Sequence, residues 1–373
     1  MKDKLTTIAI HTYSRALMLK TQLESAGIDC SLTGVNIVQP SVGGGVKLKV
    51  RNIEVAHALK IIEAIKEESG RDKEKTVKQM QRIRRILVPV DFSDYSLNAC
   101  RYAIGLAEKF KAEVKLFHAH FKPILDIPAY EGSHMYQLNY DKYFEEIEIR
   151  ARRNITELKD LLKKEITDQK ITGVTLSYSL GSGFADEAIM DFCEKYNPGL
   201  VVIGTHGVAE KTEGIFGSVA AKLIDRLNVP LLAVPASASY KGLDKVKNGL
   251  YATDFDENDV IALHKLIHFI RPFKMHLHCV HISIGRKKPW DPVKMESLQH
   301  SFKEDFPGQK LTCNIMVSDD VLIGLETYMR NNNVGLIAFN THKHSLFAQL
   351  FTTSITRNAI KRFNKPVFIF QSK

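Results

Sequence analysis

One order of strand and helix patterns occurs twice along this chain of 373 residues. The first copy opens with a continuous apolar run that ends in the pair Asp-Phe, within residues 84–93, and the second opens with the aligned segment 247–256, which contains the same pair. Such a run indicates a strand buried on both faces, as in a parallel sheet that helices cover on each side. A later apolar run ends in the pair Thr-His in both copies, within 200–207 and 336–343. The sequence therefore predicts two homologous α/β domains in tandem.

In the first copy, strand and helix patterns alternate from the first strand to the fifth. Apolar runs predict the strands, and amphipathic spacing predicts the helices between them. Five strands joined by four helices favour a doubly wound parallel sheet. The expected strands are 83–92, 114–121, 174–181, 199–207 and 229–235, and the expected helices are 96–110, 143–166, 184–196 and 219–227.

Spacing supports the alignment of the two copies. Gly204 lies 14 residues before Ser218, as Asn340 lies before Ser354. The segments that the alignment brings together are 114–121 with 275–282, 200–207 with 336–343, Asp91 with Asp254, and Phe92 with Phe255.

The N-terminal residues follow a different order. Strand-like and helical patterns alternate as β-α-β-β-α, with the glycine turn Gly43–Gly45 before the third strand. We therefore expect a small α+β domain at 1–70, a basic linker at 71–83, a first α/β domain at 84–240 and a second at 247–373.

Charge and composition narrow the class of protein. The net charge is +10, and the segment Arg71–Arg85 holds seven basic residues against two acidic ones. Contact with nucleic acid is one interpretation, but no interleaved aromatic residues accompany the charge, which favours a solvated linker. The absence of an 18-residue apolar run and of a signal-like N-terminal segment predicts a cytoplasmic protein that does not enter a membrane. Five scattered cysteines without a Cys-x-x-Cys pair indicate buried free thiols.

Two loops are placed to bind a ligand, because open parallel sheets bind ligands beyond the carboxyl ends of their strands. The first contains Asp91, with Ser93 expected to cap the next helix; a capping turn without a ligand is the alternative. The second runs from Gly204 through Gly207 to Gly217 and Ser218. Glycines admit phosphate oxygens close to the backbone, and the helix that starts here offers free amides, with the Ser218 hydroxyl expected to cap it. A purely structural glycine loop is the alternative.

The spacing G-x2-G-x9-G-S, the opening ILVPVDFS and the closing NVPLLAVP resemble the universal stress protein family. The resemblance covers roughly 84–373 and implies Rossmann-like domains of the adenine nucleotide α-hydrolase type. It implies that ATP, or ADP or AMP, binds in the first copy, with a divalent ion such as Mg²⁺. The residues implied to surround adenosine are Pro89, Val90, Asp91 and Ala119, and those implied to hold ribose and phosphates are Gly204, His206, Gly207, Gly217, Ser218 and Val219.

The second copy lacks the glycines of this loop. Asn340, Lys343 and Thr353 take the places of Gly204, Gly207 and Gly217. These side chains would fill the space that the phosphates take in the first copy. We therefore expect the second site to be degenerate and unable to bind a nucleotide. A smaller anion held by Lys343 and neighbouring hydroxyls is the alternative.

Other polar residues have simpler interpretations. His118, His120, His276, His278 and His281 lie on or near second-strand positions, where core or edge histidines are favoured over a metal cluster. Around the glycine loop only Asp91, His206 and Glu210 are candidate bases for hydrolysis, so turnover is expected to be slow or absent.

Three hypotheses of function follow. The first is a stress-response or signalling module in which nucleotide binding changes contacts with another domain or with a protein partner. The others are a slow ATP-hydrolysing enzyme and a nucleotide-free scaffold. We also expect 231–234 to pair with 367–370, which would make an intrachain pseudo-dimer of the two domains. The N-terminal segment resembles small bacterial signal-transducing domains, which implies a ferredoxin-like sandwich.

Overall fold

The computed structural model describes most of the chain. The described residues are 5–11, 13–33, 46–62, 83–121, 133–206, 217–236, 238, 242–255, 259–288, 291–341 and 365–371. The basic segment 71–82, the glycine turn at 43–45, and Gly207 and Glu210 of the glycine loop lie outside them, as do Lys343, Thr353 and Ser354.

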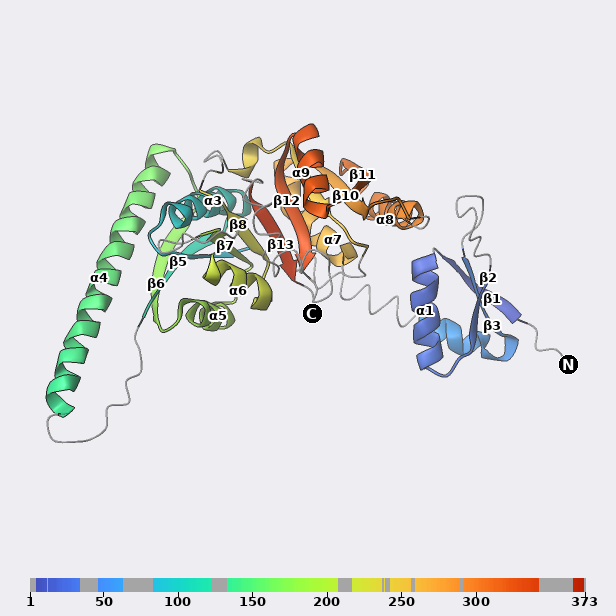
Figure 1. The fold of residues 1–373 in the computed structure, drawn as a ribbon, viewed down its shortest axis with the longest axis horizontal. Helices are drawn as coiled ribbons and strands as arrows, with labels where there is room; N and C mark the ends of the chain where they lie inside the picture. Colours follow the sequence, from blue (N-terminus) through green and yellow to red (C-terminus); the bar gives the residue numbers. More distant parts are fainter. Residues whose placement is uncertain are drawn as a thin grey trace.

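The N-terminal unit is a three-stranded antiparallel sheet with two helices, in the expected β-α-β-β-α order (Figure 1). Its strand order β1-β3-β2 is that of a ferredoxin-like sheet without its last strand among the described residues. Leu23, Leu48 and Val50 are fully buried in its own small core. Its elements are β1 (Leu5–His11), α1 (Tyr13–Ser25), β2 (Cys30–Thr33), β3 (Val46–Arg51) and a helix at 55–62.

The two following halves have the same internal order of strands. Numbering the strands of each half from one to five, both sheets run 3-2-1-4-5, which is the doubly wound arrangement. The first half contains β4 (Arg85–Pro89), α3 (Asp94–Phe110), β5 (Glu113–His120), α4 (Ser133–Asp168), β6 (Thr175–Ser182), α5 (Ala185–Tyr196), β7 (Leu200–Gly204), α6 (Ser218–Arg226) and β8 (Leu231–Val234). The second contains β9 (Asn248–Ala252), α7 (Asp259–Ile270), β10 (His276–Ile284), α8 (Asp291–Asp305), β11 (Leu311–Ser318), α9 (Val321–Asn331), β12 (Val334–Thr341) and β13 (Val367–Gln371).

The two halves join into one sheet of ten strands through their last strands. The expected pairing occurs: β8 and β13 are antiparallel neighbours, with Leu232 opposite Phe368. Every other pair of strands in this sheet is parallel. Aromatic rings reinforce the junction, since the ring of Phe269 on α7 lies 5.6 Å from that of Phe110 on α3 and 4.3 Å from that of Phe368.

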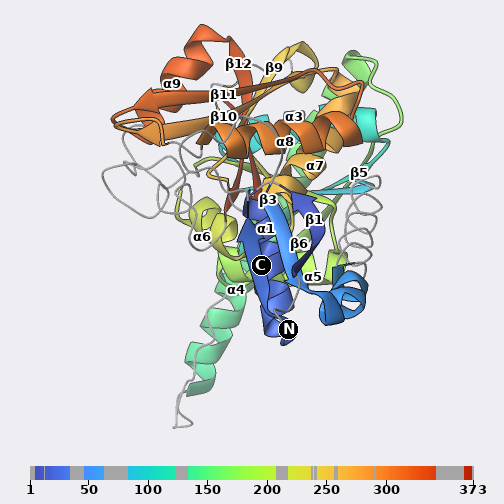
Figure 2. The same cartoon turned by 90° about the vertical axis from the view of Figure 1, so that its right-hand side faces the viewer.

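Helices cover both faces of the sheet (Figures 1 and 2). Alternate residues of one strand enter different cores, as Ile86 and Val88 pack under α3 while the intervening Leu87 packs under α5 and α6. One core contains residues of α3, α4, α7 and α8, and the other contains residues of α5, α6 and α9. This two-sided burial explains why the strands read as continuous apolar runs.

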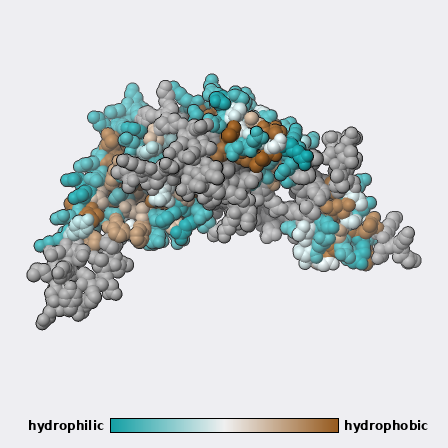
Figure 3. Space-filling view, in the orientation of Figure 1, coloured by the Kyte–Doolittle hydropathy of each residue, from teal (hydrophilic) through white to brown (hydrophobic). Residues whose placement is uncertain are grey.

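Helix α4 begins ten residues before the apolar spacing of the sequence predicts. Ala151, Ile155 and Leu162 are buried against the sheet, whereas Tyr143 and Ile149 are exposed. The coloured part of this helix is nevertheless mostly hydrophilic in the space-filling view, with scattered hydrophobic residues (Figure 3).

Strand pairing corrects one part of the repeat alignment. Glu113 pairs with Arg85 in the first half, and His276 pairs with Asn248 in the second. Because Arg85 and Asn248 are equivalent, Glu113 is equivalent to His276, and the alignment of 114–121 with 275–282 was wrong by two residues. A shift of two keeps every side chain on its face of the strand, so the apolar pattern could not reveal it. The alignment of β7 with β12 is confirmed by the registers of both strands.

Candidate functional site

The first half has a sharply reversed turn at the end of β4. Phe92 adopts a left-handed conformation with φ of 66°, which is uncommon for a residue with a side chain. The Asp91 carboxylate accepts hydrogen bonds from the backbone amide of Ser93 at 3.1 Å and from its hydroxyl at 2.6 Å. Ser93 caps α3 as expected by accepting from the Ser96 amide at 3.2 Å. The turn therefore fixes Asp91 and the start of α3 together.

His118 and Ala119, at the end of β5, lie beside the turn that follows β4. One ring nitrogen of His118 lies 2.8 Å from the Val90 carbonyl oxygen, and its ring lies 4.5 Å from the Phe92 ring. Burial disfavours the charged imidazolium and lowers the pKa of His118, which the hydrogen bond to Val90 partly opposes. A neutral His118 that donates to Val90 therefore holds the turn in shape.

Gly204 ends β7 where it presses against the start of α3. A Cβ at Gly204 would lie 2.8 Å from the carbonyl carbon of Tyr95 and 3.0 Å from the Ser96 amide nitrogen. Packing alone therefore requires glycine at this position, which the sequence explained by the approach of phosphate, with a structural role as the alternative. The His206 ring lies 5.2 Å from the Tyr95 ring, and its Nδ1 lies 3.2 Å from the Thr205 hydroxyl.

Helix α6 begins beside the end of β7. The amide of Gly217 donates to the Thr205 carbonyl oxygen at 2.6 Å, which fixes the start of the helix next to the sheet. Gly217 is the N-cap and provides no side-chain cap, so the expectation that the Ser218 hydroxyl caps the helix was wrong: Ser218 is its first helical residue. The first amides of a helix lack carbonyl partners within it and lie at the positive end of its dipole. This end of α6 is therefore a suitable place for an anion.

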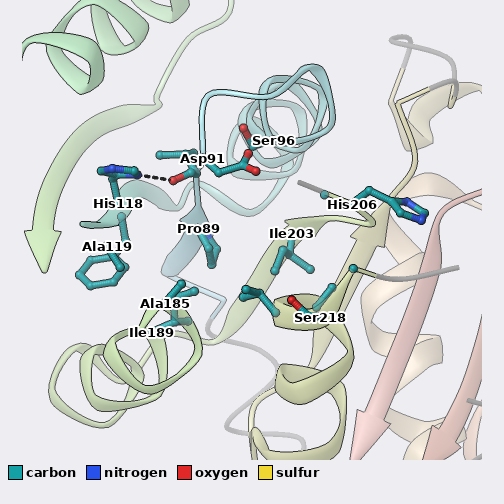
Figure 4. A pocket seen from close by; sticks show the side chains of 16 residues that line it. Pro89, Asp91, Ser96, His118, Ala119, Ala185, Ile189, Ile203, His206 and Ser218 are labelled. Carbon is teal, nitrogen blue, oxygen red and sulfur yellow. Dashed lines mark hydrogen bonds between the residues drawn. The ribbon is translucent and has the colours of Figure 1, made fainter. Parts of the chain in front are cut away.

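These segments enclose a pocket of about 320 Å³ at the point where the strand order reverses, between β4 and β7 (Figure 4). In Figure 4, His118 and Ala119 lie on one side of the pocket, and His206 and Ser218 lie on the other. Gly207 lies outside the described residues. The other nine residues that the resemblance implied all line the pocket: Pro89, Val90, Asp91, Ala119, Gly204, His206, Gly217, Ser218 and Val219.

Sequence reasoning missed the apolar walls of the pocket. Ala185 and Ile189 of α5 and Phe117 of β5 contribute to them, together with Ile203. Ala185 and Ile189 are four residues apart on one helix face, a spacing that equally describes ordinary core packing. Asp91 is the only carboxylate among the described lining residues, and no lysine or arginine is among them.

The corresponding region of the second half keeps the turn. Phe255 has φ of 64°, and a ring nitrogen of His281 lies 2.8 Å from the Thr253 carbonyl oxygen, as His118 does from Val90. Ile282, however, is equivalent to Ala119. Ile282 is buried and packs on Gly324 of α9, where an added Cβ would lie 3.0 Å from Ile282 Cγ2. The larger side chain thus takes the space that is open in the first half.

The histidines at second-strand positions of the second half make hydrogen bonds within the sheet. Among the described residues, no group of three or more His, Cys, Asp or Glu side chains is placed to bind a metal ion. His276 lies 2.7 Å from the Thr312 hydroxyl and His278 lies 3.0 Å from the Tyr328 hydroxyl, so both act as hydrogen-bonded sheet residues. None of the described helices has the length and apolarity to cross a bilayer.

A doubly wound α/β domain with a pocket at its switch point defines a class of small-ligand-binding folds. Within that class, residues 82–235 match the model of the universal stress protein family. Universal stress protein MJ0531 of Methanocaldococcus jannaschii is 31% identical over 152 residues, which are 40% of this chain and 81% of that protein. Universal stress protein MJ0577 of the same organism is 25% identical over 160 residues, which are 40% of this chain and 94% of that protein. The chain belongs to the universal stress protein family.

The similarity of fold extends over both halves. A universal stress protein of Archaeoglobus fulgidus matches 78% of this chain and 99% of its own, with a TM-score of 0.54 and 16% identity. At that identity the match describes the fold alone. It agrees with the repeated strand order of the ten-stranded sheet.

Proposed function

We propose that the first half binds an adenine nucleotide, ATP or its shorter relatives, in the pocket between β4 and β7. The observation that carries the proposal is the convergence of four separate segments on one cavity. The ends of β4, β5 and β7 and the start of α6 supply its walls. A flat heterocycle requires apolar walls with a few fixed polar groups, and this lining has that composition.

The two ends of the pocket suit the two ends of a nucleotide. Val90, Ala119 and Ile189 form the apolar end, where an adenine ring would lie. The start of α6 forms the other end, where Gly217, Ser218 and Val219 would hold phosphates through backbone amides and a hydroxyl, together with Gly207. The described lining contains no lysine or arginine, so the helix terminus and a bound divalent ion would balance the phosphate charge.

We propose domains at 84–240 and 247–373, of which only the first binds nucleotide. Ile282 fills the adenine position of the second, and Asn340 replaces Gly204. A nucleotide bound in the first domain could affect the second domain through α3, which connects the pocket to the strand at the domain junction. The Asn98 amide donates to the Pro235 carbonyl oxygen at 2.8 Å, directly after β8, which pairs with β13. This connection supports a stress-response or signalling module in which bound nucleotide alters the domain junction or the binding of a protein partner.

Calorimetric titration of the full chain with ATP, ADP and AMP tests the proposal. We expect one site per chain for at least one nucleotide. Ala119→Ile, which introduces the residue of the second half, should weaken binding at least about 100-fold, a loss of about 2.7 kcal/mol. Ala236→Ile is the matched control, because Ala236 is exposed and does not line the pocket.

Gly207→Lys introduces the second half's residue into the phosphate loop and should also abolish binding. Unchanged affinity in both Ala119→Ile and Gly207→Lys would reject the assigned site. Two sites per chain would instead show that the second half binds nucleotide despite Ile282.

A further inference from the structure

Two cysteines of the second half occupy directly opposite positions on neighbouring parallel strands. Cys279 on β10 pairs with Cys313 on β11 in the register of the sheet. Paired residues of parallel strands project to the same face, and both side chains join the core that contains residues of α7 and α8. A strand separation of about 4.8 Å lies within the Cα separation of roughly 4.4–6.8 Å that a disulfide requires. The spacing of the two strands therefore satisfies the Cα requirement of a disulfide.

The two thiols differ in exposure and in acidity. Cys279 is fully buried, while Cys313 is partly exposed on β11, one of the two edge strands of the described sheet. Hydrogen bonding with Cys279 lowers the pKa of the Cys313 thiol, whereas burial raises the pKa of Cys279. Thiolate character and access together favour reaction at Cys313 first.

This pair is a property of the second half and not of the fold. The equivalent residues of the first half are Leu116 and Tyr178, which are paired in the same way on β5 and β6. The other three cysteines are distributed over the N-terminal sheet, α3 and α5. Burial raises their pKa values, that of Cys193 to about 12. They provide internal controls for any test of reactivity.

We propose that Cys279 and Cys313 are a modification site that a hydroperoxide converts reversibly into a disulfide. The Cys313 thiolate attacks one peroxide oxygen, the O–O bond breaks, and the departing hydroxide takes up a proton as water, which leaves Cys313 as a sulfenic acid. The Cys279 sulfur then attacks the Cys313 sulfur, and the S–O bond breaks. The hydroxyl departs as water with the proton of Cys279. Two thiols are oxidised, and hydrogen peroxide is reduced to two waters.

The cross-link would restrain an exposed edge of the molecule. It would close the segment 279–313, which contains the whole of α8 between the two strands. Within the described part of the chain, strand β11 is held by its ladder with β10 and packs against α8 and α9. Oxidation would therefore fix this edge while leaving the nucleotide pocket of the first half unaltered.

Peptide mapping of the full-length chain tests the proposal without any variant. The reduced protein is divided, one part is treated with hydrogen peroxide, free thiols are alkylated in denaturant, and both parts are digested with trypsin. Cleavage after Lys274, Arg286, Lys310 and Arg330 yields the cysteine peptides 275–286 and 311–330. We expect these two peptides to be linked only after peroxide and to separate on reduction with dithiothreitol. Cys30, Cys100 and Cys193 should remain alkylated in both parts.

Detection of sulfenic acid gives a second measurement. In Cys279→Ser, dimedone should label Cys313 after peroxide, whereas the natural chain should escape labelling because the disulfide forms. Cys193→Ser is the matched control and should form the linked peptides as the natural chain does. The proposal is overturned if peroxide leaves all five thiols alkylated, if Cys313 is recovered only as sulfinic or sulfonic acid, or if the link joins two chains on a non-reducing gel.

Discussion

The two halves of the ten-stranded sheet share a turn and differ in what surrounds it. Phe92 and Phe255 both adopt left-handed conformations, at φ of 66° and 64°. His118 and His281 both hold the carbonyl before the turn at 2.8 Å. In the first half the turn and its histidine border a pocket. In the second half the same turn and histidine lie next to buried polar side chains. The turn, which both halves share, is thus a feature of the fold. Whether a pocket forms beside the turn depends on the neighbouring side chains.

The second half contains a polar network where the first has apolar residues. Tyr251 and Thr253 replace Val88 and Val90, and both of their hydroxyls donate to Asp259, which replaces Ser96. Asp259 is 2% exposed, so hydrogen bonds within the protein, including these two, replace water around its carboxyl group. A side-chain network in the second half therefore occupies a region that borders the pocket in the first.

Asp259→Ala is expected to have the largest effect on stability. Removal of the carboxylate leaves the buried hydroxyls of Tyr251 and Thr253 without their shared acceptor, at a cost of about 3 kcal/mol in the free energy of unfolding. The equivalent Ser96→Ala removes one hydrogen bond from the Ser96 hydroxyl to the Ser93 carbonyl oxygen, with a cost of about 1 kcal/mol. Urea unfolding of both variants measures the difference. Equal losses would mean that the network contributes no more than a single hydroxyl.

Gly204→Asn, which introduces the residue of the second half, is expected to have the next largest effect. The new Cβ would meet the Tyr95 backbone at 2.8 Å, so strand and helix must separate, at a cost of about 2 kcal/mol. Gly105→Ala on α3 is the control, because a Cβ there meets no atom within 4 Å. Thermal unfolding should show a lower midpoint for Gly204→Asn alone. If the midpoint equals that of the natural chain, packing does not require glycine at this position. The approach of a phosphate group to the backbone would then be the better explanation.

The sequence predicted the architecture well because the central strands of the sheet, such as β4, β7 and β8, are buried on both faces and helices such as α3, α5 and α6 are amphipathic. It failed where two arrangements satisfy the same pattern. The slip of two residues at β10 preserves strand alternation, and Ile189 has the same spacing in a pocket wall as in a core. The packing of Gly204 on Tyr95 joins residues 109 positions apart, which no local pattern can reveal. The second half's network was likewise hidden, since Asp259 resembles an ordinary first-turn acid.

The shared histidines should have the smallest effect, and that effect should depend on pH. Burial is the main cause that lowers the pKa values of His118 and His281 in the folded chain below the ordinary value of 6.5. Between the folded and unfolded pKa values the unfolded chain binds more protons, so stability rises with pH there and is lost as the pH falls below about 6.5.

Substitution by asparagine retains a donor for the carbonyl oxygen and removes the titration. His118→Asn and His281→Asn should each therefore lose less stability than the natural chain between pH 7.5 and pH 5.5, measured by urea unfolding. His57→Asn, at an exposed position in the N-terminal unit, controls for the substitution itself. The two histidines contact equivalent turns in the same way. The two variants should therefore reduce the dependence of the free energy of unfolding on pH by similar amounts. A change in only one variant would show that the environments of the two turns, and not the turn itself, govern this acid sensitivity.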